Sequence, residues 1–400
     1  MVNANSISLP QLPAQDDAKS VVVEDKGIAR VVTLNRPRVL NCLNHEMVLT
    51  IIKHYEEWET DENVHFVVVK GNGRVFCAGG DLRMFFNAKK GDDSLSTTEV
   101  IYCKYWLDYH VGTYKKPLIA LWTGLVMGGG AGLTVPGRFR VATEKAMFSM
   151  PEAALGLHTD CGSSFWLSRL PGHLGEYLAL TGHRLDGAEM LTCGLATHFV
   201  PLQRLPELEK QLYELTSGDL DTLQKTLDEF SIPTTPGERS ILHRTGAIDN
   251  LFCKDSVEDI LAALEVQFNE LAEDWVKEVI KIIKRSSPTG LKVTFNSIRE
   301  ARKKTWAECL RTEYRLTINA IKGTVSNDFY EGIRAIVVDK DNRPKWNPTS
   351  LQEVTPQDLK LVFQPFKENL ELQLQDPRFV QSGWSGNFLQ TAYHVEHATQ

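Results

Sequence analysis

Two carboxylates stand close together in an apolar stretch near the middle of the chain, "MPEAALGLHTD". Glu152 follows a proline, and Asp160 precedes a Cys-Gly pair. Burial raises the pKa of a carboxyl group because it disfavours the charged form, which suits a proton shuttle. Such a pair could activate water or protonate a leaving group. Each residue also has a structural interpretation, Glu152 as an acid at a helix N-terminus and Asp160 as a cap or turn residue.

Two glycine-rich turns could supply the other half of such a site. The segments "VFCAGGDL" and "LVMGGGAGL" each place glycines between an apolar strand and a helix. Glycine is costly in regular structure, so these positions indicate backbone that must stay bare. Unpaired N–H groups at a helix start lie at the positive end of its dipole. Two such turns that converge would form an oxyanion hole for a thioester or enolate oxygen. Tight helix–strand packing is the alternative reason for these glycines.

Neither turn fits a nucleotide-binding loop. The segment "GNGRVFCAGGD" is not G-x-G-x-x-G, and "MGGGAG" lacks the G-K-[ST] of a phosphate-binding loop. The cysteines contain no C-x-x-C pair, and no cluster of His, Cys and Asp has the spacing of metal ligands. We therefore expect no metal and no separate cofactor.

Composition narrows the partners and the compartment. The chain has 400 residues, a formal net charge of −7 and 42% hydrophobic residues, which is typical of a globular protein. We see no basic block that would favour nucleic acid, and no apolar run of the ~18 residues that span a membrane. We find neither a secretory leader, nor the bias of a transit peptide, nor a C-terminal peroxisomal signal. We expect a cytoplasmic protein by default, with mitochondrial or peroxisomal location as the alternative.

The elements that must position the candidate residues alternate between strand and helix as far as residue 200. Short β runs flank "DKG" and predict a hairpin, and apolar spacing predicts helices over 45–60 and about 98–114. The runs "VHFVVVKG" and "PLIALWTG" are typical of buried strands. This alternation predicts an α/β fold with a mainly parallel sheet.

A change in composition follows residue 201, where long helical periodicities rich in Leu, Glu and Lys begin. We predict a flexible lead over 1–19, a core over 20–205, a helical C-terminal region over 206–346 and a polar tail over 347–400.

Together these segments resemble a known family. In order and spacing, "NRPRVLNCLN", "GNGRVFCAGGDL", "GLVMGGGAGL", "RFRVATEKAMFSMPEAALGL" and "LTGHRLDGAEMLTCGLATHFV" are similar to the crotonase (enoyl-CoA hydratase/isomerase) superfamily. The later "SPTGLK", "TEYR" and "DFYEGIRAIVVDKDNRPKW" resemble its 3-hydroxyisobutyryl-CoA hydrolase branch. The resemblance implies a spiral of β-β-α turns, with a helical C-terminal region that helps to cover an acyl-CoA site.

The resemblance also implies roles for individual residues. The N–H groups of Gly80 and Gly129 would hold the thioester oxygen. Glu152 would activate water or attack the carbonyl carbon, and Asp160 would orient the substrate hydroxyl or water, or relay a proton. The residues implied to contact substrate or CoA are Ala78, Asp81, Lys104, Gly128 and Arg36. Cationic side chains suit the phosphates of CoA, and Arg38, Arg74 and Lys340 are further candidates for that role.

Some positions depart from the family pattern. A hydratase has a second glutamate where this chain has Gly132. The hydrolase branch has a glutamate where Lys104 stands, "FPD" where the chain has His158-Thr159-Asp160, and "GGG" at 162–164 where the chain has Gly-Ser-Ser. We interpret His158 as a residue that lines the site.

The predicted function is hydrolysis of a short branched or β-hydroxy acyl-CoA thioester, as in valine catabolism, with CoA as part of the substrate. Alternatives are an isomerase or a hydratase-type lyase on the same scaffold, or a weakly active acyl-CoA-binding protein. The expected partner is the small-molecule acyl-CoA, with no nucleic acid and no membrane, and the protein is expected to be a monomer or a homo-oligomer.

Overall fold

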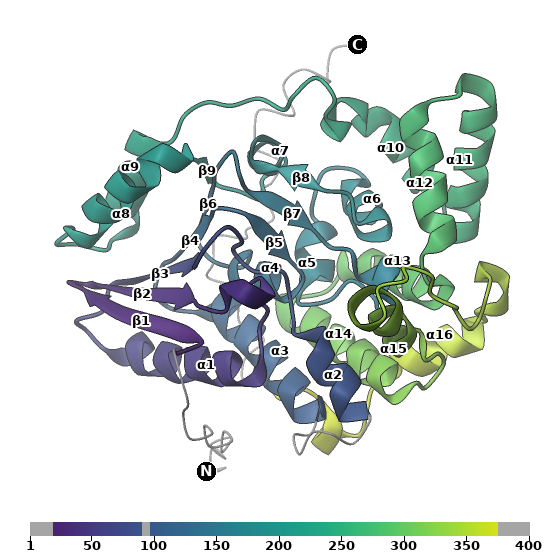
Figure 1. Ribbon diagram of the computed structural model, residues 1–400, viewed down its shortest axis with the longest axis horizontal. Coiled ribbons are helices and arrows are strands. Elements are labelled where there is room, and N and C mark those ends of the chain that lie inside the picture. The colour runs from purple at the N-terminus through teal and green to yellow at the C-terminus, as the bar shows by residue number, and fades with distance from the viewer. Residues whose placement is uncertain (1–18, 90–96, 375–400) are drawn as a thin grey trace.

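The computed structural model describes residues 19–89 and 97–374 (Figure 1). The predicted lead over 1–19 therefore lies outside the described residues except for Lys19, and so does the part of the predicted tail beyond residue 374.

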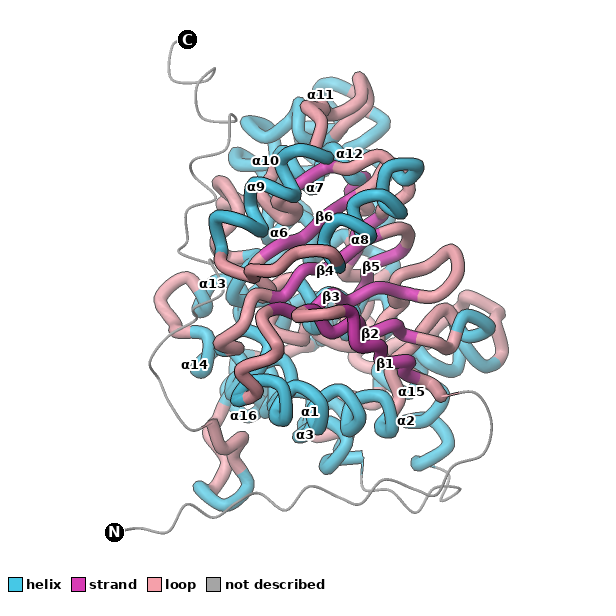
Figure 2. The backbone as a smooth tube through the Cα atoms, turned by 90° about the vertical axis from the view of Figure 1, so that its left-hand side faces the viewer, coloured by secondary structure: helices cyan, strands magenta, loops and turns pink. Residues whose placement is uncertain are grey.

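A six-stranded sheet runs through the N-terminal half, in the order β1-β2-β3-β4-β6-β9 (Figure 2). β1 and β2 pair antiparallel around the predicted hairpin, with Lys26 opposite Ala29, and the other pairs are parallel. The described strands are β1 (Val21–Lys26), β2 (Ala29–Leu34), β3 (Phe66–Gly71), β4 (Leu118–Trp122), β5 (Leu125–Met127), β6 (Phe139–Ala142), β7 (Met147–Ser149), β8 (Leu185–Asp186) and β9 (His198–Phe199).

Both faces of this sheet are buried, which explains why its central strands are continuously apolar. Along β3, Val67 and Val69 join the larger core cluster, whereas Phe66 and Val68 join a second cluster on the opposite face. Helices α1 and α3 contribute to the first cluster, and α8 and α9 cover the second.

The predicted helices of the N-terminal half are confirmed. The helix expected over 45–60 is α1, and the helix expected over about 98–114 is α3, which begins one residue earlier and ends one earlier. Helices in this half are α1 (His45–Thr60), α2 (Leu82–Lys89), α3 (Thr97–Thr113), α4 (Gly129–Thr134), α5 (Ser163–Leu167), α6 (Leu174–Thr181) and α7 (Gly187–Thr192).

A second, three-stranded sheet has the order β5-β7-β8, with β5 and β7 parallel. A single bridge between Cys77 and Val126 links β5 to the chain that follows β3. Because of this bridge, the ends of two separate β segments, each followed by a helix, lie next to each other.

The chain beyond β9 is helical, as the sequence predicts. Its helices are α8 (Leu205–Tyr213), α9 (Leu220–Phe230), α10 (Thr245–Phe252), α11 (Val257–Leu271), α12 (Asp274–Arg285), α13 (Pro288–Ala301), α14 (Trp306–Lys322), α15 (Asp328–Ile333) and α16 (Pro356–Phe363). α14 packs on α3, and α13 packs on α5 and α6 (Figure 1). None of the helices in the described part of the chain is long and apolar enough to cross a membrane.

Part of the predicted tail packs on this helical region. α16 contacts α14, and Arg315 of α14 forms a two-pronged ion pair with Glu371. The predicted domain boundaries themselves stay predictions.

Candidate active site

The two glycine turns meet. The N–H of Cys77 donates to the carbonyl of Leu125 (2.9 Å) and that of Met127 to the carbonyl of Cys77 (3.0 Å), which aligns the two β segments up to their turns. A Cβ placed on Gly129 would lie 3.4 Å from the nitrogen of Gly80. Gly129 is the first residue of α4, where the helix offers no partner for its N–H. Among the described residues, neither this N–H nor that of Gly80 donates a main-chain hydrogen bond.

Gly128 shows why the turn must be glycine. Its φ is +44°, and a Cβ there would lie 3.0 Å from Oε1 of Glu152. A side chain at this position would be strained and would crowd the carboxyl group. The glycine turn and the candidate acid are therefore in contact distance.

Glu152 begins a short 3₁₀ helix, Glu152–Leu155, directly after Pro151. It is buried, and its Oε2 has no hydrogen-bond partner among the described residues. Burial, and then the negative charge of Asp160, hold the pKa of Glu152 well above its ordinary value. A carboxyl group in this state can take up and return a proton at neutral pH.

Asp160 lies in the same cavity wall and is buried. The hydroxyl of Tyr105, from α3, donates to Oδ2 of Asp160 at 3.4 Å. The backbone just after Asp160 is unusual, with φ of +61° at Cys161 and +81° at Gly162. A left-handed conformation at a residue with a side chain persists only where its surroundings hold it.

Glu313 of α14 provides that support. Its carboxyl group accepts hydrogen bonds from the N–H groups of Gly162 and Ser164, the latter at 2.8 Å, and so caps the start of α5. Burial is the main cause that raises the pKa of Glu313 to about 8. The "TEYR" segment thus fixes the loop that carries Asp160.

These residues enclose a cavity of about 110 Å³. Its lining combines both glycine turns, Glu152 and Asp160 with apolar side chains from α2, α3 and the C-terminal helices. The apolar and neutral lining includes Leu43, Val48, Phe85, Val100, Ile101, Leu155, Thr317, Ile321 and Phe329.

Lys104 also lines the cavity, and α3 supplies its partner. Nζ of Lys104 forms a buried ion pair with Asp108, one helical turn further on. Burial alone would lower the pKa of Lys104, but the charges of Asp108, Cys161 and Asp160 outweigh it and raise that pKa. Burial raises the pKa of Asp108 to about 6 even beside the lysine. The cation at 104 is therefore compensated rather than free.

The surroundings of Gly132 explain why this chain lacks the second carboxylate of a hydratase. A Cβ at this position would lie 2.6 Å from Cβ of Cys161 and 3.0 Å from Oδ1 of Asp108. The site has no room for a glutamate there.

Some of the predicted CoA contacts line the cavity and others do not. Arg36 pairs with Asp81 at 3.0 Å and donates to the carbonyl of Cys42, and its charge is therefore partly satisfied. Ala78 lines the cavity, with its N–H bonded to the carbonyl of Leu40. Arg38, Arg74 and Lys340 are exposed, and none of them lines the cavity.

Comparison with known proteins identifies the family. A family model described as enoyl-CoA hydratase/isomerase matches residues 29–363. The chain belongs to this family. The resemblance inferred from the sequence motifs is thereby confirmed.

Relatives of the family match almost the whole chain. "3-hydroxyisobutyryl-CoA hydrolase-like protein 5" of Arabidopsis thaliana is 47% identical over 94% of this chain and 97% of its own. "3-hydroxyisobutyryl-CoA hydrolase, mitochondrial" of Gallus gallus is 39% identical over 88% of this chain and 91% of its own. "Small ribosomal subunit protein mS47" of Arabidopsis thaliana is 41% identical over 90% and 89%. The name of the Gallus relative agrees with the alternative location, and the cytoplasmic location stays a prediction.

Solved structures confirm the predicted fold class. A carnitinyl-CoA dehydratase from Mycobacterium thermoresistibile is 33% identical, with a TM-score of 0.80 over 90% of this chain and 99% of its own. The chain has the crotonase fold of the family, with its helical C-terminal region.

Sequence reasoning missed several residues of the site. Asp108 could have been found, because Lys104 and Asp108 are charged residues one turn apart in a helix that is apolar on most sides. Tyr105 and Thr317 gave no such signal, and Glu313 appeared only within the motif "TEYR" with no role assigned to it. The roles of all three depend on contacts between α3, α14 and the loop after Leu157.

Proposed function

We propose that this protein hydrolyses a short branched or β-hydroxy acyl-CoA thioester, in the manner of a 3-hydroxyisobutyryl-CoA hydrolase. The observation that carries the proposal is the convergence of two unpaired N–H groups, from Gly80 and Gly129, beside the buried carboxyl of Glu152. Donors aimed at a developing oxyanion in a dry cavity are among the largest contributions to acyl transfer. The names of the Arabidopsis and Gallus relatives support the same substrate class.

The thioester oxygen is held by the N–H groups of Gly80 and Gly129. Glu152 takes a proton from water as the water oxygen attacks the carbonyl carbon, and returns it to the sulfur as the C–S bond breaks. The remaining proton of that water stays on the new carboxylic acid, which faces Asp160. Attack by Glu152 itself, through an anhydride, is the alternative route.

The hydratase alternative is disfavoured by the crowding at Gly132, which leaves no place for the second glutamate. An isomerase would need only the Glu152–Asp160 pair. The relative named as a ribosomal protein favours a second candidate, a structural role without turnover. Its similarity extends over nine-tenths of this chain. The position of Glu152, Asp160 and both glycine turns around one cavity supports turnover instead.

Thiol release from a panel of acyl-CoAs separates these functions. With 3-hydroxyisobutyryl-CoA and related short acyl-CoAs, a hydrolase releases free thiol at a rate that saturates with substrate. An isomerase changes enoyl or dienoyl absorbance without thiol, and a structural protein does neither. Absence of thiol release from every member of the panel would reject the proposal.

A further inference from the structure

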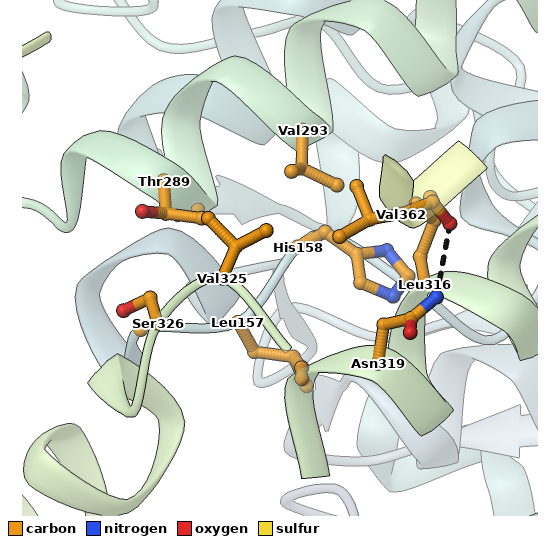
Figure 3. A pocket seen from close by; sticks show the side chains of 12 residues that line it. Leu157, His158, Thr289, Val293, Leu316, Asn319, Val325, Ser326 and Val362 are labelled. Carbon is orange, nitrogen blue, oxygen red and sulfur yellow. Dashed lines mark hydrogen bonds between the residues drawn. The ribbon is translucent and has the colours of Figure 1, made fainter. Parts of the chain in front are cut away.

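A second cavity shares Leu157 with the acyl cavity and is also lined by the next residue, His158 (Figure 3). It has a volume of about 40 Å³, which is room for roughly two water molecules. α13, α14 and α16 form its walls, and Figure 3 shows the imidazole of His158 among Leu316, Val362 and Asn319. Thr289 and Ser326, which also line it, are partly exposed.

A chain of hydrogen bonds joins the two cavities. Nε2 of His158 lies 2.9 Å from Oγ1 of Thr317, and the same Oγ1 lies 2.8 Å from the hydroxyl of Tyr105. That hydroxyl lies 3.4 Å from Oδ2 of Asp160. All four side chains are buried. His158 lines the second cavity, and Thr317 and Asp160 line the acyl cavity.

The direction of the hydrogen bonds in this chain follows from the partner of Nδ1 of His158. Nδ1 of His158 lies 3.1 Å from the carbonyl of Thr159, which can only accept, so Nδ1 carries the proton in the neutral ring. Nε2 of the neutral ring then accepts from Thr317. With Asp160 protonated, each group along Asp160, Tyr105, Thr317 and His158 donates to the next.

We propose that His158, Thr317 and Tyr105 form a proton relay that carries a proton from Asp160 to the second cavity. The proposal rests on the proposed hydrolysis, in which water supplies two protons. One reaches the thiol sulfur through Glu152. The other is left on the product carboxylic acid and must leave while CoA fills the acyl cavity.

The transfer is balanced at each step. The product acid gives its proton to Asp160, and the product becomes a carboxylate. The proton of Asp160 moves to the oxygen of Tyr105, that of Tyr105 to Thr317, and that of Thr317 to Nε2 of His158. The imidazolium turns away from Thr317 and gives its Nε2 proton to water in the second cavity. This restores the neutral ring with its proton on Nδ1, and the hydroxyl rotors then return.

The surroundings of His158 favour prompt release of that proton. Burial lowers the pKa of His158, and the charge of Asp160 partly opposes this. Apart from His158, the residues that line the second cavity carry no ionisable side chain. In the family pattern a phenylalanine stands at position 158, so the relay would be a property of this chain and of relatives that share the histidine.

Isosteric variants test the relay. We expect Tyr105→Phe, Thr317→Val and His158→Phe each to lower kcat by ~10-fold or more. This is less than the ~10²–10⁴-fold contribution of a group that transfers a proton in the chemical step itself. KM should change little. Either substitution alone interrupts the relay, so a second one should have no further effect. The double variant Tyr105→Phe/Thr317→Val should therefore be no slower than the slower single variant. Thr317→Ser, which keeps the hydroxyl, should recover most of the rate.

Matched controls separate transfer from packing. Tyr177→Phe and Thr226→Val remove buried hydroxyls that bond to His183 and to the carbonyl of Thr222, away from both cavities, and should leave kcat unchanged. Losses that multiply in the double variant, wild-type rates in the single variants, or a Thr317→Ser rate as low as that of Thr317→Val would overturn the relay. If the wild-type protein releases thiol and the Tyr105, Thr317 and His158 variants release it at the same rate, only the relay fails; if the wild-type protein releases none, the proposed hydrolysis has failed.

Discussion

At the scale of single residues, burial sets the chemistry of the carboxyl groups. Glu152 stands in an apolar cavity beside Asp160, and both the burial and the neighbouring charge favour its protonated form. This is the behaviour that the sequence suggested from an acid in an apolar segment. The sequence could not show that Oε2 is unpaired or that Oε1 lies close to Gly128, because these depend on a turn more than twenty residues away.

A pH-dependent cost in stability follows for Glu152. The pKa of Glu152 is higher in the folded than in the unfolded chain, so the folded state binds more protons above pH 4.5. The free energy of unfolding therefore falls as the pH rises above 4.5 towards the pKa of the folded state. Glu152→Gln does not titrate. We expect it to raise the melting temperature by about 2 °C or more at pH 8, and by less at pH 5. Thermal unfolding at both pH values checks this, and a gain that is larger at pH 5 would contradict it.

At the scale of elements, the site is built where chain segments end against one another. The turn after Cys77 and the start of α4 meet because β5 aligns with the end of the first segment. Periodicity predicted α1 and α3 within a residue. The strand expected at "FCA" is only a single bridge at Cys77, and the one strand expected to run to near Met127 is divided into β4 and β5, which belong to different sheets. It did not predict that α14 would hold the loop after Asp160 through Glu313, since more than a hundred residues separate the two.

Removing one N–H tests the start of α4. A proline is tolerated at the first position of a helix, so Gly129→Pro deletes the donor with little cost to the helix itself. Gly129→Ala is the matched control, because it adds the Cβ near Gly80 and Lys104 but keeps the N–H. We expect the proline variant to lose ~10²–10³ in kcat relative to the alanine variant. Equal rates of thiol release in the two folded variants would show that this N–H is not used.

At the scale of the whole molecule, the predicted core and the helical region share one interior. Trp306 of α14 stacks edge-on against Phe165 of α5, and its ring lies where a Cβ on Gly162 would be. Thr317 and Phe329 complete the acyl cavity. Sequence composition marks a boundary near residue 201, but packing across it was not readable, because each helix shows only that it has an apolar face.

A truncated chain should therefore fail. We expect residues 19–205 alone to be poorly soluble and to show no thiol release, because the surface under α13 and α14 would be an exposed apolar patch. Expression of this fragment, with far-UV circular dichroism and a co-expressed 206–374 fragment as control, measures this. A soluble, folded and active fragment would contradict a shared interior.

The most direct test of the central claim is thiol release by Glu152→Gln, measured beside acyl-CoA binding by calorimetry. Glutamine keeps the shape of the side chain but cannot take up the proton of water. We predict a loss of ~10²–10⁴ in kcat with acyl-CoA affinity nearly unchanged. Turnover at the wild-type rate would contradict the account. It would show that Glu152 is not the acid that acts together with the N–H groups of Gly80 and Gly129.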